Sequence, residues 1–158
     1  MSSKLLSIKN LYKVFKVGLT SVVAVEDVSF EIEKNDSVSI VGESGSGKTT
    51  IANLILGVET PTSGSIKFEN NELDFSKKEL RKKIQFVQQN PLSSLNPKKT
   101  IYQTLELPLK IHNICSKKEI RNRIIKLLNY VDLDESFLER HPYSLSGGQR
   151  QRISIARA

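Results

Sequence analysis

Short runs of alternating apolar and polar residues dominate the first part of the chain. Such alternation predicts β-strands, because residues two positions apart in a strand point to the same face. The predicted strands are Leu5–Lys9, Val22–Val25, Val28–Ile32, Val38–Val41, Ser65–Phe68 and Ile84–Val87. The run Val38–Val41 leads directly into glycines, which is typical of the carboxyl end of a buried parallel strand. A helix is predicted to follow over Lys48–Leu56.

The later part of the chain has the pattern of helices. The pairs Ser76…Glu79 and Ser116…Glu119 predict capping boxes, in which each side chain satisfies a free amide at a helix start. Ser146 is expected to cap a last helix that is still running at Ala158. In the helix after Glu119, apolar residues share one face and Lys and Arg lie opposite, so we expect this face to pack in a core. That apolar face consists of Ile120, Ile124, Leu127, Leu128 and Val131.

Composition narrows the class of protein. The chain has 158 residues, of which 38% are hydrophobic and 26% charged. This length suits one domain, and the composition excludes a disordered tail, a collagen-like chain and an integral membrane protein. No apolar run approaches the ~18–20 residues that span a bilayer, and the first residues lack the continuous apolar core of a signal peptide. The single Cys115 has no partner for an internal disulfide, as is common in a reducing compartment.

The net charge of +7 is unevenly distributed. Residues 1–79 carry 9 basic and 11 acidic residues (−2), whereas residues 80–158 carry 15 and 6 (+9). A basic half can bind nucleic acid, an acidic membrane surface or a phosphate ligand, but a solvated Lys-rich surface is the commoner meaning. The sequence has no basic patch interleaved with aromatic residues, so nucleic acid is not expected as a partner.

A glycine-rich loop carries the clearest chemistry. Residues Gly42–Thr49 read Gly-Glu-Ser-Gly-Ser-Gly-Lys-Thr and match the pattern G-x-x-x-x-G-K-[ST], between a predicted strand and a predicted helix. Glycines let the backbone amides converge on an anion, and the helix N-terminus adds partial positive charge. Lys48 would reach the β- and γ-phosphates, and the Thr49 hydroxyl would bind Mg²⁺. The sequence therefore predicts nucleotide binding.

A second glycine motif, Leu-Ser-Gly-Gly-Gln, occupies Leu145–Gln149. It is predicted to form another helix N-terminus with exposed amides and a hydroxyl, which also suits a phosphate. Standing alone, it would indicate only a helix cap.

With both motifs in this order, the chain resembles the ATP-binding subunits of ABC transporters. The loop Gly42–Thr49 corresponds to Walker A, and Leu145–Ala158 to the family's signature motif. Gln89, in Val-Gln-Gln-Asn-Pro, matches the glutamine loop. The segment Asn90–Pro97, Asn-Pro-Leu-Ser-Ser-Leu-Asn-Pro, resembles most the importers of oligopeptides, dipeptides and nickel.

The resemblance implies an α/β fold of the P-loop NTPase, ABC-ATPase type. That fold combines an N-terminal antiparallel β part, a P-loop core and a helical subdomain, and its C-terminal core strands would be missing here. The chain would be a single partial domain. It would consist of a β-rich part with the P-loop core (1–88), the glutamine loop and helical subdomain (89–145) and the signature helix (146–158).

The resemblance also implies the site residues. Phe15 lies where the family places an aromatic that stacks on adenine, with Tyr12 as the second candidate and a plain core position as the alternative. The catalytic positions present would be Lys48 and Gln89, and Mg²⁺ would be held by Thr49 and Gln89. The residues that would bind ATP are Phe15, Gly42, Glu43, Ser44, Gly45, Ser46, Gly47, Lys48, Thr49 and Thr50. Acting in trans on the γ-phosphate held by a second subunit would be Ser146, Gly147, Gly148 and Gln149.

The family's pattern continues beyond the signature motif. A Walker B strand with an Asp for Mg²⁺ and a Glu as general base should follow, and then a D-loop and a switch histidine. Asp132, Asp134 and Glu135 precede the signature and cannot replace them, and neither His112 nor His141 is the switch histidine. We therefore expect the 158-residue chain alone to be nearly inactive as an ATPase and marginally folded, because strand Val38–Val41 would lack its flanking strands.

The expected function is the ATPase subunit of an importer for peptides or nickel. Its partners would be a second ATPase subunit, identical or paralogous, the integral membrane permease and, indirectly, an extracytoplasmic binding protein. Its place would be the cytoplasmic face of the membrane. The alternatives are a soluble ABC ATPase outside transport and a non-catalytic remnant that binds only nucleotide or a partner.

Overall fold

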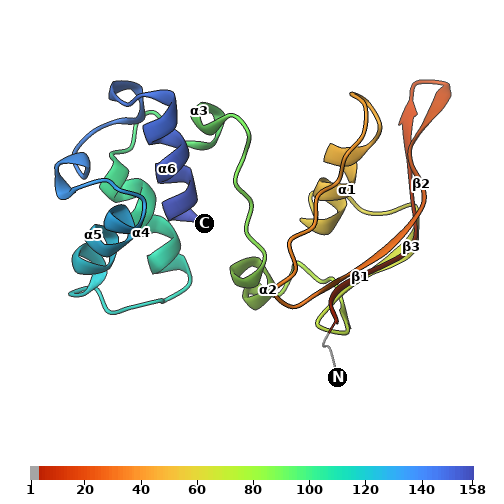
Figure 1. Cartoon of the computed structure of the whole chain (residues 1–158), viewed down its shortest axis with the longest axis horizontal. Coiled ribbons are helices and arrows are strands. Elements are labelled where there is room, and N and C mark those ends of the chain that lie inside the picture. Colours follow the sequence, from red (N-terminus) through yellow and green to blue (C-terminus); the bar gives the residue numbers. More distant parts are fainter. Residues whose placement is uncertain (1–3) are drawn as a thin grey trace. The chain divides into compact units, whose positions relative to one another are not determined.

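The computed structural model describes residues 4–158, with the side chains of all of these except Lys78, Leu92 and Ser93. The chain divides into two compact units, Met1–Ile84 and Gln85–Ala158 (Figure 1). We describe each unit by itself. The first holds the sheet and the phosphate loop, and the second is helical.

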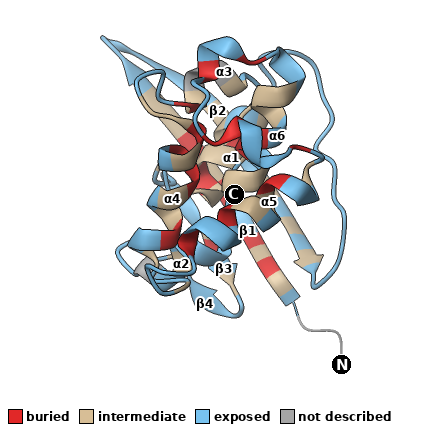
Figure 2. Ribbon diagram, turned by 90° about the vertical axis from the view of Figure 1, so that its left-hand side faces the viewer, coloured by how far each residue is buried: buried red, intermediate tan, exposed pale blue. Residues whose placement is uncertain are grey.

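An antiparallel sheet forms the frame of the first unit. Its strands lie in the order β2-β1-β3-β4. The long strands β1 (Lys4–Val17) and β2 (Thr20–Glu33) form a hairpin, and β3 (Ser63–Phe68) pairs with the other edge of β1. The short β4 (Asn71–Glu72) pairs with β3. Buried positions lie along β1, whereas the hairpin tip is exposed (Figure 2). The strands predicted at Leu5–Lys9 and Ser65–Phe68 are therefore confirmed, and those predicted at Val22–Val25 and Val28–Ile32 form one continuous strand, β2.

Two predicted strands are wrong. Neither Val38–Val41 nor Ile84–Val87 forms a strand. A strand needs a neighbour for its backbone hydrogen bonds, and in the part of the chain that the structure describes none pairs with either segment. Val41 is 90% exposed, so the burial expected for this strand is wrong as well. Ile84–Val87 instead follows helix α2 (Lys78–Lys83) at the boundary of the two units.

Helix α1 (Lys48–Ile55) begins directly after the glycine-rich loop, as predicted. Its buried residues Ile51 and Leu54 pack against the sheet. The partners in this core are Leu6, Ile8, Leu11, Val25 and Ile66. Packing of α1 on the sheet thus fixes where its N-terminus, and with it the loop, is held.

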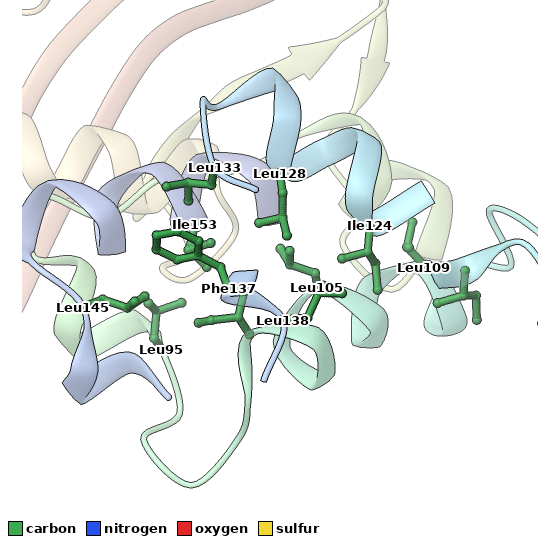
Figure 3. Close-up of a cluster of buried hydrophobic side chains, with 12 residues drawn as sticks. Leu95, Leu105, Leu109, Ile124, Leu128, Leu133, Phe137, Leu138, Leu145 and Ile153 are labelled. Atoms are coloured by element: carbon green, nitrogen blue, oxygen red, sulfur yellow. The ribbon is translucent and has the colours of Figure 1, made fainter. Parts of the chain in front are cut away.

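Short helices surround a separate core in the second unit. The principal helices are α4 (Ile101–Ile111), α5 (Ile120–Tyr130) and α6 (Gly147–Arg157). The short α3 (Pro91–Ser94) precedes α4, and η1 (Glu135–Phe137) and η2 (Pro142–Ser144) lie between α5 and α6. Side chains from α4, α5, α6 and η1, and from the segments between the helices, converge in one cluster (Figure 3). Ile120, Ile124 and Leu128 on α5 are buried there, and Val131 packs against them, which confirms the predicted core face at these four residues. Leu127 is not part of the cluster, and Ile125 packs against the cluster instead.

The predicted helix starts have different outcomes. Ser146 caps α6 in a complete capping box with Gln149. Ser76 does not cap α2: the N-cap residue is Lys77, and Ser76 instead donates to the nearby Asp74 carboxylate from its Oγ (2.6 Å) and its amide (3.0 Å). At Ser116 only half of the box forms: the Glu119 carboxylate accepts from the Ser116 amide and hydroxyl, but α5 starts at Ile120 with Glu119 as its N-cap, three residues later than predicted. A capping box that we did not predict joins Thr100 and Gln103 at the start of α4.

Candidate nucleotide site

The glycine-rich loop folds around the ammonium group of Lys48. Lys48 Nζ donates to the carbonyl oxygens of Gly42 (2.8 Å) and Glu43 (2.6 Å), and Ser46 Oγ lies 3.4 Å away. A backbone hydrogen bond from Ser46 to Glu43 (3.2 Å) tightens the same turn. The positive charge is therefore held against the backbone of the loop.

Helix α1 presents uncapped amides to the end of this loop. Gly47 is its N-cap residue and forms no side-chain cap, and the first turn contains no acidic residue. The first intrahelical bond runs from the Ile51 amide to the Gly47 carbonyl (2.9 Å), so the amides of the first turn have no intrahelical acceptor. These amides and the helix dipole favour an anion at this end of α1.

Gly47 is required by its surroundings as well as by its backbone. Its φ is +86°, and a Cβ there would lie 2.2 Å from the carbonyl oxygen of Ala24. Ala24 lies at an irregularity of the hairpin, because Lys13 pairs with Val25 while Val14 pairs with Val23. The sheet thus touches the phosphate loop at its last glycine, and only a residue without a side chain permits this contact.

A cavity of about 500 Å³ borders the other side of the loop. Gly42, Ser46 and Lys48 lie at its edge, but most of its walls are apolar. The apolar residues are Val28, Phe30, Val38, Ile40, Val41 and Ile51. Such walls do not suit a triphosphate, so we assign the anion site to the amide-bearing end of α1 and not to this cavity.

The two aromatic candidates for adenine stacking differ in their surroundings. The Tyr12 hydroxyl donates to Glu26 (3.3 Å), and burial together with the Glu26 charge raises the pKa of Tyr12. Phe15 is half-buried, pairs with Val22 across the hairpin and has the Lys13 ammonium 4.7 Å from its ring centroid. Phe15 thus has a cation on its ring, whereas Tyr12 is engaged through its hydroxyl.

The signature residues stand at the N-terminus of α6 in the second unit. The Gln149 amide donates to Ser146 Oγ (3.3 Å), and the Ser146 amide donates to Gln149 Oε1 (3.0 Å). Ser146, Gly147 and Gly148 are exposed, and a Cβ at either glycine would meet nothing within 4 Å. Packing within this chain therefore does not require glycine at these positions.

The remaining predicted site residues are placed as follows. Thr49 is exposed and Thr50 half-buried, both in the first turn of α1, and Glu43 and Ser44 are exposed in the loop. Gln89 is exposed in the irregular stretch before α3 and belongs to the second unit, as the signature does. Among residues 4–158, no cluster of three or more His, Cys, Asp or Glu side chains forms a metal site. Within that range no helix has the length and apolarity to cross a bilayer.

Comparison with known proteins identifies the family. The ABC transporter family matches residues 25–158. The chain belongs to this family. The same match confirms the resemblance expected from the Walker A and signature motifs.

Similar proteins agree with this placement. The chain is 43% identical to the dipeptide transport ATP-binding protein DppF of Haemophilus influenzae, over 96% of this chain and 49% of that protein. It is 42% identical to the oligopeptide transport ATP-binding protein AppF of Bacillus subtilis, over 90% of this chain and 44% of that protein. The chain thus spans about half the length of the curated relatives it matches.

Solved structures confirm the expected α/β ABC-ATPase fold. A bacterial ABC transporter cassette solved as a dimer matches with a TM-score of 0.83 and 36% identity, over 97% of this chain and 68% of that chain. An ATP-binding cassette in a dimeric post-hydrolysis state, bound to ADP and phosphate, matches with a TM-score of 0.82 and the same identity and coverage.

Proposed function

We propose that this chain is the nucleotide-binding part of an ATPase subunit that drives peptide import through an ABC transporter. One observation carries the proposal. The Lys48 ammonium is held against the backbone of a glycine-rich loop that ends on the uncapped N-terminus of α1. Similarity to subunits named for dipeptide and oligopeptide transport supports the peptide cargo. None of the relatives described above is named for nickel, so nickel stays a prediction.

The loop residues fit a nucleotide triphosphate. Free first-turn amides can donate to phosphate oxygens, and Lys48 can exchange its carbonyl partners for the β- and γ-phosphates. We propose that the Thr49 hydroxyl holds Mg²⁺, which neutralises phosphate charge when bound. The part of Gln89 in binding Mg²⁺ stays a prediction from the family resemblance. Phe15 would stack on adenine through the ring face opposite Lys13. The other loop residues named above would surround the phosphates.

The glycines of the signature support a role in trans. Glycine in a helix costs roughly 1 kcal/mol relative to alanine, and among the described residues no atom within 4 Å of a Cβ at Gly147 or Gly148 would require glycine there. Close approach by another molecule would explain both residues. We propose that Ser146, Gly147, Gly148 and Gln149 contact the γ-phosphate held by a second ATPase subunit. Similar cassettes solved as dimers support this arrangement.

Hydrolysis also needs a general base, and two of the carboxylates before the signature, Asp132 and Asp134, have structural partners instead. Asp134 caps η1 by accepting from the Ser136 amide (2.7 Å), and Asp132 pairs with Arg152 (3.5 Å). We therefore propose that the chain by itself binds ATP and turns it over little. In the working transporter it would act at the cytoplasmic membrane face, with the permease and indirectly a substrate-binding protein.

Titration calorimetry with ATP and Mg²⁺ tests the proposal. Lys48→Ala removes a charge-assisted contact, so we expect the affinity for ATP to fall by at least ~10-fold. Lys34→Ala removes an exposed Lys outside the loop and should leave the affinity unchanged. Unchanged binding by Lys48→Ala, or no ATP binding by the unaltered chain, would overturn the proposal. Association with an integral membrane permease, measured by copurification, tests the transport role separately.

A further inference from the structure

Lys13 is an almost fully buried cation on the central strand of the first unit. Only 9% of the residue is exposed, although lysine is rarely buried without a partner. Its ammonium pairs with the Glu59 carboxylate (2.8 Å) and donates to the Thr60 carbonyl oxygen (2.9 Å). The same ammonium lies over the Phe15 ring, 4.7 Å from its centroid. Three directed contacts thus fix one atom, Lys13 Nζ.

Two of those contacts, with Glu59 and Thr60, connect Lys13 to the segment that follows α1, the helix after the phosphate loop. Glu59 follows the C-terminal end of α1, and its amide donates to the Asn53 carbonyl on that helix (3.2 Å). Further along the same segment, the Thr62 amide donates to the Tyr12 carbonyl (2.8 Å), and Thr62 Oγ1 accepts from the Val14 amide (3.0 Å). The segment after α1 is therefore fastened to β1 on both sides of Lys13.

The third contact leads to the aromatic ring. A cation within about 6 Å of a ring centroid is attracted to the face of the ring, and the attraction is greater when the cation is shielded from water. Phe15 is half-buried and stands two residues from Lys13 on the strand, so the two side chains lie on the same face and the ammonium occupies one face of the ring. The orientation of the Phe15 ring therefore depends on the ion pair between Lys13 and Glu59.

We propose that Lys13 is a positioning residue. It orients the Phe15 ring for stacking on the nucleotide base and fixes the position of the ring relative to the phosphate loop. The inference rests on the proposed nucleotide site and on stacking by Phe15. Lys13 itself does not touch the nucleotide. Its removal should weaken recognition of the base and leave recognition of the phosphates intact.

Comparing ATP with inorganic tripolyphosphate, which has no base, separates these two effects. Both are titrated with Mg²⁺ into the full 158-residue chain. We expect Lys13→Met to weaken ATP binding ~3–10-fold, the range of a shielded cation–ring contact, and to leave tripolyphosphate binding unchanged. Lys13→Arg keeps a cation over the ring and should restore most of the ATP affinity. Lys16→Met, an exposed Lys on the same strand, is the matched control and should change neither affinity.

A double-mutant cycle tests whether Lys13 acts through the ring. In a Phe15→Ala background, Lys13→Met should cause no further loss of ATP affinity. A further loss of the same size would overturn the inference, as would equal weakening of ATP and tripolyphosphate. Glu59→Gln leaves Lys13 in place and removes only its counter-charge. If Lys13→Met does not fold, Glu59→Gln decides, because it should weaken ATP binding ~2–5-fold and spare tripolyphosphate. The same weakening of both ligands, or of neither, would contradict the proposal.

The failure of this inference can be told apart from the failure of the proposed function. If the unaltered chain binds neither ATP nor tripolyphosphate, the nucleotide site is wrong and the role of Lys13 falls with it. If the unaltered chain binds both and Lys13→Met behaves like it, only the role of Lys13 is wrong.

Discussion

Gly47→Ala should destabilise the first unit more than its backbone strain alone explains. An alanine at φ +86° costs about 1–2 kcal/mol because its Cβ approaches the following carbonyl. The new Cβ would also lie 2.2 Å from the Ala24 carbonyl oxygen, whereas real Cβ contacts stay beyond about 3.0 Å. The loop or the strand must therefore move by at least 0.8 Å (3.0 − 2.2). Overpacking of this kind typically costs a further ~1–3 kcal/mol.

Two other glycines provide matched controls. Gly18 (φ +62°) and Gly45 (φ +85°) also have left-handed backbones, but a Cβ at either would meet nothing within 4 Å. Gly18→Ala and Gly45→Ala should thus cost only the strain, about 1–2 kcal/mol. Urea unfolding followed by far-ultraviolet circular dichroism gives the three free energies of unfolding. A loss for Gly47→Ala no greater than for Gly18→Ala would refute the claim that the sheet contacts the loop through Ala24.

Two further predictions concern the helical unit. Ser146→Ala and Thr100→Ala each remove a capping box, so each should lower the free energy of unfolding by about 1 kcal/mol. Only Ser146→Ala should also weaken the ATP-dependent association of two ATPase subunits, measured by sedimentation. Equal association of the two variants would contradict the trans role of Ser146. Hydrogen bonds from the Ser116 Oγ and amide hold the pKa of Glu119 below its ordinary value of 4.5. The native state therefore binds this proton more weakly than the unfolded state, so the free energy of unfolding should fall as the pH drops below about 4.5 through the lowered pKa. Urea unfolding at a series of pH values measures this dependence, and the free energy of unfolding should fall less steeply with pH in Glu119→Gln than in the unaltered chain. Parallel slopes for the two proteins would contradict this assignment.

Features set by nearby residues were predictable from the sequence. The spacing of glycines and Lys48 predicted both the loop and the start of α1, because those residues determine the backbone and the cap locally. Ser146 likewise has its capping partner, Gln149, within one turn. The cap predicted at Ser76 is wrong: α2 starts one residue later, with Lys77 as its N-cap, and Ser76 bonds to the local carboxylate of Asp74.

Features that depend on distant partners were not predictable in the same way. The run Val38–Val41 has the composition of a strand, but a strand forms only beside another, and none pairs with it among residues 4–158. Lys13 alternates with apolar neighbours and has the pattern of an exposed residue. Its partner Glu59 lies 46 residues away (59 − 13), so no local signal reveals the ion pair. The roles of the site residues, including Phe15 and Gln89, stay predictions until they are tested.

The bonds of Lys48 to the Gly42 and Glu43 carbonyls have a thermodynamic consequence. A nucleotide entering this loop competes for an ammonium that is already solvated by the protein, so the heat of binding reflects an exchange of acceptors rather than a newly formed contact. The internal bonds also keep the loop's curvature before any ligand arrives, which lowers the ordering entropy that binding must overcome. Lys48 would therefore have two roles: its ammonium binds the phosphates, and its bonds to the Gly42 and Glu43 carbonyls hold the shape of the loop.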